Sequence, residues 1–232
     1  MQEHYEDKTE KVPTYFGYVR KELLELIPEN SKGGSLLEIG AAGGNTTLYA
    51  KEHGYAEKIY GVELCPIEGS NQNHPSFSKF IIGDLEKMEL PFEEKSLDVI
   101  LCGDVLEHLV DPYTQVAKLQ PLLKDDGVLI VSLPNIRQWR IVKKILVHGD
   151  FQYEDSGILD RTHLRFFTKR NMIDLFENNG YQVQKIVPND MCSTDKTKLH
   201  QRFFKKLSCI KRHLFEEFYA TQYYLVLSKK TF

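Results

Sequence analysis

The sequence has few cysteines, a single tryptophan and no long apolar run. Its four cysteines, at positions 65, 102, 192 and 209, lack the spacing of zinc ligands or redox pairs, so we expect reduced structural thiols. No apolar stretch approaches the roughly 18 residues that a membrane-spanning helix needs. The first seven residues are polar and acidic, unlike a secretory signal peptide. These absences predict a cytoplasmic protein.

The composition is that of an ordinary globular chain. Its 232 residues are 41% hydrophobic, enough for one sizeable core, and we expect one domain over 1–232. The net charge of −3 hides a basic C-terminal part, because residues 191–232 contain nine Lys/Arg and three Asp/Glu. A basic helical segment is predicted over 190–215, between the last two strands. Its stretch 196–213 is either a solvated helix face or in weak contact with a membrane surface. We expect no nucleic-acid partner and leave a homodimer open.

Helical and strand patterns alternate along the chain. Apolar residues at helical spacing predict a helix over 15–27, within an N-terminal helical cap at residues 1–30. The alternation favours an α/β fold with a parallel sheet, helices on both faces and a ligand beyond the carboxyl ends of the strands. It stops over 135–168, where we expect an insertion that overhangs the ligand site. Strands are predicted at 35–39, 58–63, 79–82, 97–102, 127–132, 181–187 and 221–228, and further helices at 45–53 and 169–179.

The stretch from Ser35 to Thr47 is the most informative one. It reads as a buried strand containing Glu38, a turn rich in glycine and the start of a helix. Glycines let the backbone approach a ligand, and the amides that open a helix favour an anionic group. Because the acid lies two residues before Gly40, it can face a cation. The motif therefore predicts a ligand that carries both a cation and an anion.

Three more acids fall at or just after strand ends. Glu63 follows the first glycine at the distance typical of an acid that grips ribose hydroxyls. Asp84 can accept a hydrogen bond from the amino group of an adenine. Asp104 has a second interpretation, because Asp104-Val-Leu-Glu107 also fits a capping box at a helix start.

These motifs resemble those of the class I S-adenosylmethionine-dependent methyltransferases. The resemblance is carried by Leu36-Leu-Glu-Ile-Gly-Ala-Ala-Gly-Gly44, Gly61-Val-Glu63, Gly83-Asp84 and Asp98-Val-Ile-Leu-Cys-Gly-Asp-Val-Leu-Glu-His108. It implies a Rossmann-like seven-stranded, mostly parallel sheet with the last strand antiparallel, and S-adenosyl-L-methionine as cofactor with S-adenosyl-L-homocysteine as product. Ala42 departs from the family, which has glycine there. The cofactor-binding residues implied are Glu38, Gly40, Ala42, Gly44, Glu63, Leu64, Gly83, Asp84, Leu85, Gly103 and Asp104.

A later segment resembles a narrower group, the methyltransferases associated with polysaccharide biosynthesis. Ser132-Leu-Pro-Asn135 and Asp155-Ser-Gly-Ile-Leu-Asp-Arg-Thr-His-Leu-Arg-Phe-Phe-Thr168 carry this likeness. It implies O-methylation of a sugar hydroxyl in a nucleotide sugar or surface-glycan precursor. Two alternatives stay open: N- or O-methylation of a small non-sugar metabolite, and a non-catalytic cofactor-binding module.

Two histidines are candidates for the general base that a hydroxyl acceptor requires. His163 lies between two arginines, which would keep it neutral, and His108 follows the fourth strand. Arg161 and Arg165 either clamp an anionic acceptor or pair with Asp155 or Asp160. Asn135 is a further candidate for acceptor binding. Since Pro134-Asn135 stands where a second acid would be needed beside Asp104, we predict no metal.

Overall fold

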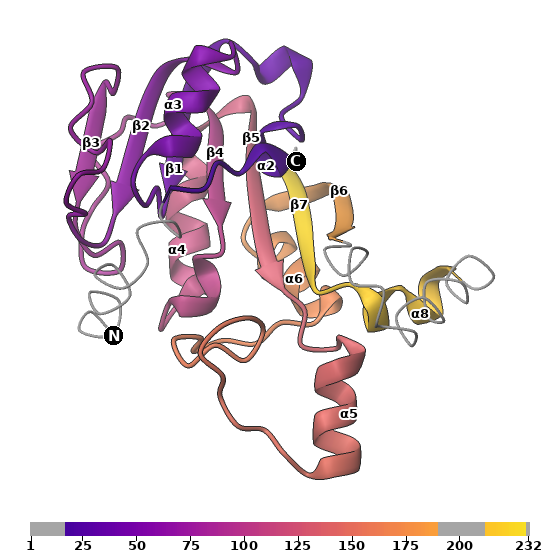
Figure 1. Cartoon of the computed structure of the whole chain (residues 1–232). Coiled ribbons are helices and arrows are strands. Elements are labelled where there is room, and N and C mark those ends of the chain that lie inside the picture. Colours follow the sequence, from indigo (N-terminus) through magenta and orange to yellow (C-terminus); the bar gives the residue numbers. More distant parts are fainter. Residues whose placement is uncertain (1–16, 190–211, 231–232) are drawn as a thin grey trace.

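A seven-stranded sheet in the order β3-β2-β1-β4-β5-β7-β6 organises the protein (Figure 1). The computed structural model describes residues 17–189 and 212–230. The predictions for residues 1–16 and for most of the basic segment, with its membrane contact, lie outside these residues. The strands are β1 (Gly34–Ile39), β2 (Ala56–Glu63), β3 (Lys79–Ile82), β4 (Leu97–Gly103), β5 (Leu123–Pro134), β6 (Tyr181–Asn189) and β7 (Gln222–Lys229).

The strand directions confirm the predicted fold. Strands β1 to β5 run parallel, whereas β7 lies antiparallel between β5 and β6. The central strand β1 is an almost unbroken apolar run because both of its faces are covered, as is usual in parallel sheets. Its register places Glu38 beside Gly61 on one side and Leu101 on the other. The carboxyl ends of β1, β2, β3 and β4 therefore meet at one edge.

Helices cover both faces of the sheet. Side chains of α2 (Lys21–Leu24) and α3 (Asn45–Glu52), such as Leu23 and Leu48, pack in one apolar cluster with β1, β2, β4 and β5. Side chains of α4 (Pro112–Leu119) and α6 (Lys169–Glu177), such as Val116 and Phe176, pack in the cluster on the other face. The helix α8 (Arg212–Tyr219) precedes β7. Among the described helices, none is long and apolar enough to cross a membrane.

The chain after β4 differs from the sequence prediction. A 3-10 turn, Leu106–His108, follows the strand, and the helix α4 begins only at Pro112. The carboxylate of Asp111 caps that helix by accepting a hydrogen bond from the amide of Thr114 at 3.1 Å. The capping-box interpretation of Asp104 is therefore wrong: its carboxylate is engaged in other contacts, and its backbone is left-handed with φ of 54°.

The insertion at 135–168 contains a helix that the sequence pattern did not predict. Helix α5 (Trp139–His148) projects from the edge where β5 ends, and an extended return leads to α6 (Figure 1). Ile141 on α5 packs with Ile158 and Leu159 in a small apolar cluster of its own. This cluster packs the segment between α5 and α6, which carries His163, against α5. The N-terminal helix predicted over 15–27 is short in the described part, at Lys21–Leu24.

Candidate functional site

A cavity of about 320 Å³ lies at the carboxyl ends of β1, β2, β3 and β4. It lies where a parallel α/β sheet binds its ligand, beyond the strand ends. The cavity is lined by many of the residues predicted to bind the cofactor: Gly40, Glu63, Leu64, Gly83, Asp84, Leu85 and Asp104. The sequence motifs thus converge on one cavity.

The glycine turn after β1 forms one wall and has a strained step at Ala42. Gly40 and Gly44 have left-handed φ values of 68° and 81°, and a side chain at Gly40 would collide with Val105. Ala42 has φ of 46° although it carries a methyl group. Ala42 therefore replaces the family's glycine at a position whose left-handed backbone favours glycine.

Glu63 supports the same turn. Its two carboxylate oxygens accept hydrogen bonds at 2.7 Å from the amides of Ala42 and Leu64, and its side chain is 2% exposed. The side chain of Gln72 donates to the carbonyl of Ala42 at 2.9 Å. Glu63 thus lines the cavity and fixes the turn, a second role that the sequence did not indicate.

Four of the predicted cofactor residues do not line the cavity: Glu38, Ala42, Gly44 and Gly103. Glu38 is buried behind the wall, where it accepts a hydrogen bond from the hydroxyl of Thr47. Burial raises the pKa of this carboxyl to about 7, although Thr47 and Arg20 oppose the shift. Direct contact of these four residues with a ligand in the cavity is not supported by this geometry.

Arg20 is a residue near the site that the sequence analysis missed. Its Nη1 lies 2.6 Å from Oδ2 of Asp104, and its amide donates to Oγ1 of Thr46 at 3.2 Å. Ser132 donates to Asp104 at 2.9 Å, and Gln222 donates to it as well. A lone arginine in a predicted helix gives no signal in the sequence, because only the fold brings it to the end of β4.

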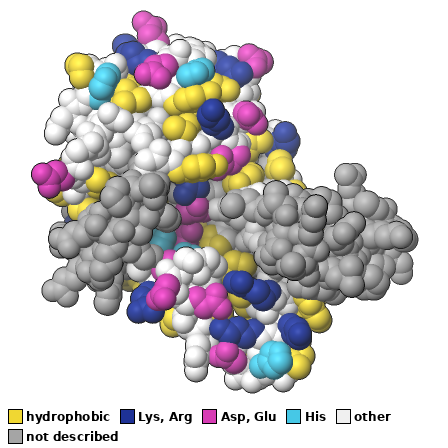
Figure 2. Space-filling view, in the orientation of Figure 1, with side chains coloured by type: hydrophobic (Ala, Val, Ile, Leu, Met, Phe, Trp, Pro, Cys, Tyr) yellow, Lys and Arg dark blue, Asp and Glu magenta, His cyan; other side chains and the backbone are white. Residues whose placement is uncertain are grey.

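A second cavity, of about 390 Å³, adjoins the first. Asp104 and His108 belong to the lining of both, so they form a shared wall. The other lining side chains are mostly polar, and carboxylates are prominent among them: Glu107, Asp155 and Asp160. In Figure 2, acidic and histidine side chains gather in a recess at the middle of the face, between the body with the sheet and the part below it.

Both predicted histidines lie at the second cavity, in contact with each other. The ring centroids of His108 and His163 are 4.7 Å apart and the rings are nearly perpendicular. Glu107 lies beside them: one carboxylate oxygen and one ring nitrogen of each histidine lie within 4.8 Å of one another. Burial raises the pKa of the Glu107 carboxyl well above its ordinary value, and the nearby Asp104 adds to this shift. From the sequence alone, Glu107 is a candidate only for a helix cap.

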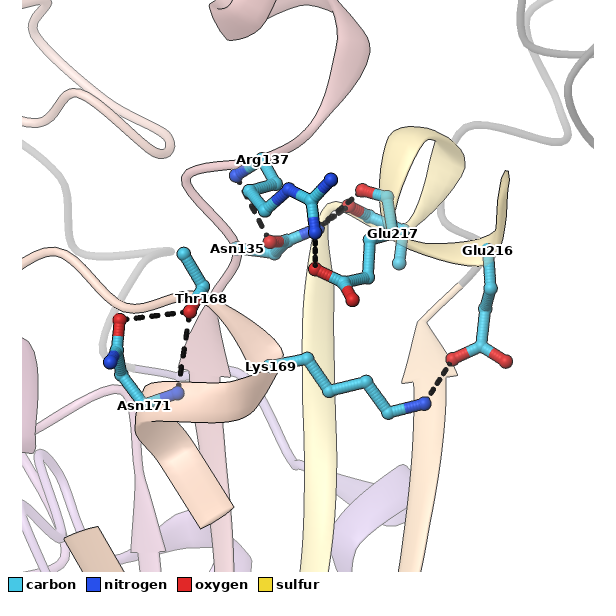
Figure 3. A network of polar contacts seen from close by, with 8 residues as sticks. Asn135, Arg137, Thr168, Lys169, Asn171, Glu216 and Glu217 are labelled. Atoms are coloured by element: carbon cyan, nitrogen blue, oxygen red, sulfur yellow. Dashed lines mark hydrogen bonds and ion pairs between the residues drawn. The ribbon is translucent and has the colours of Figure 1, made fainter. Parts of the chain in front are cut away.

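The predicted acceptor-binding residues are not in the cavity wall. Arg161 pairs with the exposed Asp155, the alternative that the sequence left open, and the Arg165 guanidinium donates to the carbonyl of Val110. Asn135 is fully buried, and its Nδ2 donates to the carbonyls of Glu217 and Ala220 at 2.7 and 2.9 Å (Figure 3). Its role in this structure is to join β5 to the end of α8. The prediction that these three residues bind the acceptor is therefore not supported.

Comparisons with known proteins agree with the predicted fold and cofactor class. The family described as a methyltransferase domain matches residues 12–186, so this chain belongs to that family. An S-adenosylmethionine-dependent methyltransferase from Mesorhizobium loti has a similar structure, with a TM-score of 0.61 at 15% identity over 92% of this chain and 99% of that one. Phosphoethanolamine N-methyltransferase 2 of Haemonchus contortus, solved with S-adenosyl-L-methionine, gives a TM-score of 0.58 at 10% identity over 91% of this chain and 52% of that one. The fold and cofactor class are thus those of S-adenosylmethionine-dependent methyltransferases.

Curated relatives of this chain are O-methyltransferases by name. The mitochondrial ubiquinone biosynthesis O-methyltransferase of Bos taurus is 25% identical over 187 residues, which are 73% of this chain and 48% of the relative. The chain spans about half the length of the curated relatives that it matches. Their names do not support the narrower resemblance to methyltransferases of polysaccharide biosynthesis.

Proposed function

We propose that the protein transfers a methyl group from S-adenosyl-L-methionine to a hydroxyl oxygen of a small-molecule acceptor. One observation carries this proposal: the cofactor cavity and the second cavity share a wall that contains His108 and Asp104. A donor in the first cavity and an acceptor in the second would meet there. Methyl transfer needs the acceptor atom in line behind the methyl group at about 3 Å, so two adjoining cavities suit it.

The residues present fit the methyl donor. Polar and acidic groups at the strand ends, Glu63 and Asp84 among them, can bind ribose hydroxyls and an adenine amino group. The sulfonium of the donor supplies the reactive methyl group, and the sulfur keeps the bonding electrons when the methyl leaves. The acceptor oxygen loses its proton at the shared wall, where His108 lies in ring contact with His163 of the second cavity. Either histidine is a candidate to take that proton.

The chemistry of the second cavity favours an acceptor rich in hydroxyl groups, such as a sugar. Glu107, Asp155 and Asp160 together with Ser156 and Thr221 offer many hydrogen-bond acceptors. A phenol is the second candidate, since the curated relatives are named for ubiquinone biosynthesis.

The proposal is tested by incubating the protein with the methyl donor and a panel of neutral sugars, amino sugars, nucleotide sugars and catechol-type phenols. Release of S-adenosyl-L-homocysteine and a methylated product, identified by mass spectrometry, are the readouts. Ser156→Phe, which adds a bulky ring to the lining of the second cavity, should lower transfer and keep affinity for S-adenosyl-L-homocysteine. Gln182→Phe, an equally bulky change on the exposed edge strand β6, should leave both unchanged. Cofactor binding without product from any acceptor would favour the non-catalytic alternative.

A further inference from the structure

The cluster of Glu107, His108 and His163 has the composition of a metal site. We propose that it binds a divalent first-row transition metal, such as Zn²⁺, in the wall between the two cavities. One donor atom of each side chain lies within 4.8 Å of the others. Two imidazoles and a carboxylate suit such metals, whereas Mg²⁺ prefers oxygen ligands alone. The role given to the metal below rests on the proposed methyl transfer, but the metal site itself does not.

Backbone carbonyl groups fix both histidines in the tautomer that can bind a metal through Nε2. Nδ1 of His108 lies 3.1 Å from the carbonyl of Thr162, and Nδ1 of His163 lies 3.0 Å from the carbonyl of Ile158. A carbonyl only accepts hydrogen bonds, so each Nδ1 carries the proton and each Nε2 has a lone pair. Histidines that bind metals through Nε2 commonly donate their other N–H to a carbonyl in this way. Two histidines with the same arrangement, in ring contact, are hard to explain by packing alone.

The carboxylate of Glu107 points to the same conclusion. Its side chain is 1% exposed, and Oε2 has no hydrogen-bond partner among the described residues. A buried carboxylate without a partner is costly, and a cation beside it removes that cost. The backbone holds Glu107 next to the insertion, because its carbonyl accepts hydrogen bonds from the amides of Leu164 and Arg165 at 2.8 and 3.0 Å. His163 is thereby kept beside Glu107.

The site has access to solvent and to an acceptor. All three side chains line the second cavity, and His108 also borders the cofactor cavity. Three protein ligands leave at least one coordination position for a substrate, as in catalytic zinc sites. A hydroxyl bound there would pass its proton to solvent water in the second cavity, since zinc lowers the pKa of bound water to about 7. The histidines would then serve as ligands rather than as the general base.

This proposal replaces the prediction that the reaction needs no metal. That prediction considered only acids at the strand ends, Asp104 and the residue after β5, which is Asn135. The donors instead come from the 3-10 turn after β4 and from the insertion. Sequence neighbours supply two of the ligands, and the fold of the insertion supplies the third.

The test is a titration of the full-length, metal-free protein with Co²⁺, followed by visible absorption, with Zn²⁺ as competitor and Mg²⁺ as comparison. We expect about one Co²⁺ per chain, displaced by Zn²⁺ and not by Mg²⁺. Glu107→Gln and His163→Ala should each weaken Co²⁺ binding by about tenfold or more. His148→Ala, at the exposed end of α5, is the matched control and should bind Co²⁺ normally. Affinity for S-adenosyl-L-homocysteine, measured by calorimetry, shows that each variant is folded.

The outcomes separate the metal site from the methyl transfer. Absence of a Co²⁺ spectrum, or a spectrum that survives both substitutions, overturns the site. Co²⁺ binding with no methylation of any acceptor keeps the site and removes the proposed function. Undiminished methyl transfer by the metal-free protein keeps the proposed function and overturns the role of the metal.

Discussion

Replacing Glu38 by glutamine should stabilise the protein, and more so at alkaline pH. The carboxyl of Glu38 is 5% exposed, and burial raises its pKa from 4.5 to about 7. The unfolded chain releases this proton near pH 4.5, whereas the folded chain holds it to about pH 7. Ionisation therefore favours the unfolded state as the pH rises through this range. The stability that Glu38 contributes is full below pH 4.5 and is lost by about pH 7.

The size of the effect follows from the two pKa values. Each unit of difference is worth 1.36 kcal/mol, so the loss amounts to about 3 kcal/mol at pH 8 and about 1 kcal/mol at pH 5. Glutamine stays neutral, and its amide oxygen can still accept the hydrogen bond from Thr47. The free energy of unfolding of Glu38→Gln should therefore exceed that of the unchanged protein by about 3 kcal/mol at pH 8, with a smaller gain at pH 5.

Urea denaturation at the two pH values, without cofactor, measures the effect. Glu52→Gln, at an exposed position at the end of α3, is the control and should change neither value. If Glu38→Gln destabilises the protein at both pH values, the ionised carboxylate is stabilised in place by Arg20, and the reasoning is refuted. Calorimetry at pH 8 adds a second readout. Weaker binding of S-adenosyl-L-homocysteine would show that the charge of Glu38 attracts the ligand's ammonium group from behind the cavity wall.

Three further changes follow from local geometry. Ala42→Gly should stabilise the protein by up to about 1 kcal/mol in thermal unfolding, because it relieves a left-handed backbone, whereas Ala41→Gly should destabilise it. Asp111→Ala removes the cap of α4 and should cost about 1 kcal/mol in urea denaturation; no loss would mean that the cap is replaced by water. Ile141→Ala empties the apolar cluster of the insertion, so amide exchange over 135–168 should speed up while S-adenosyl-L-homocysteine binding persists. If exchange speeds up and S-adenosyl-L-homocysteine binding is lost as well, the insertion is not packed separately from the cofactor cavity.

The sheet and the cofactor side could be predicted from sequence because their signals are local. A buried strand such as β1 is an apolar run, and the turn after it has glycines at two of its left-handed positions, Gly40 and Gly44. The acids Glu63 and Asp84 follow strands whose ends must meet at one edge. An apolar strand, a glycine turn and acids at the strand ends therefore indicate where the first cavity forms. Ala42 is the exception, since its left-handed backbone goes against the preference of its residue type.

The errors come from interactions between distant residues. Asp104 was a plausible helix cap by spacing, but Arg20, Ser132 and Gln222 engage its carboxylate, and the helix starts instead behind Asp111. These partners come from three different parts of the chain, and no local sequence pattern predicts them.

The residues at the second cavity were still harder to predict from the sequence. Glu107 and His108 are adjacent in sequence, yet neither spacing nor composition marks them as partners of a histidine 55 residues later. They become partners because the amides of Leu164 and Arg165 bind the carbonyl of Glu107, while the carbonyl of Thr162 faces His108. The backbone of the insertion thus fixes both the position of His163 and the tautomer of His108. Substitutions that disturb this backbone pairing should impair the acceptor side while the cofactor cavity, built from the strand ends, stays intact.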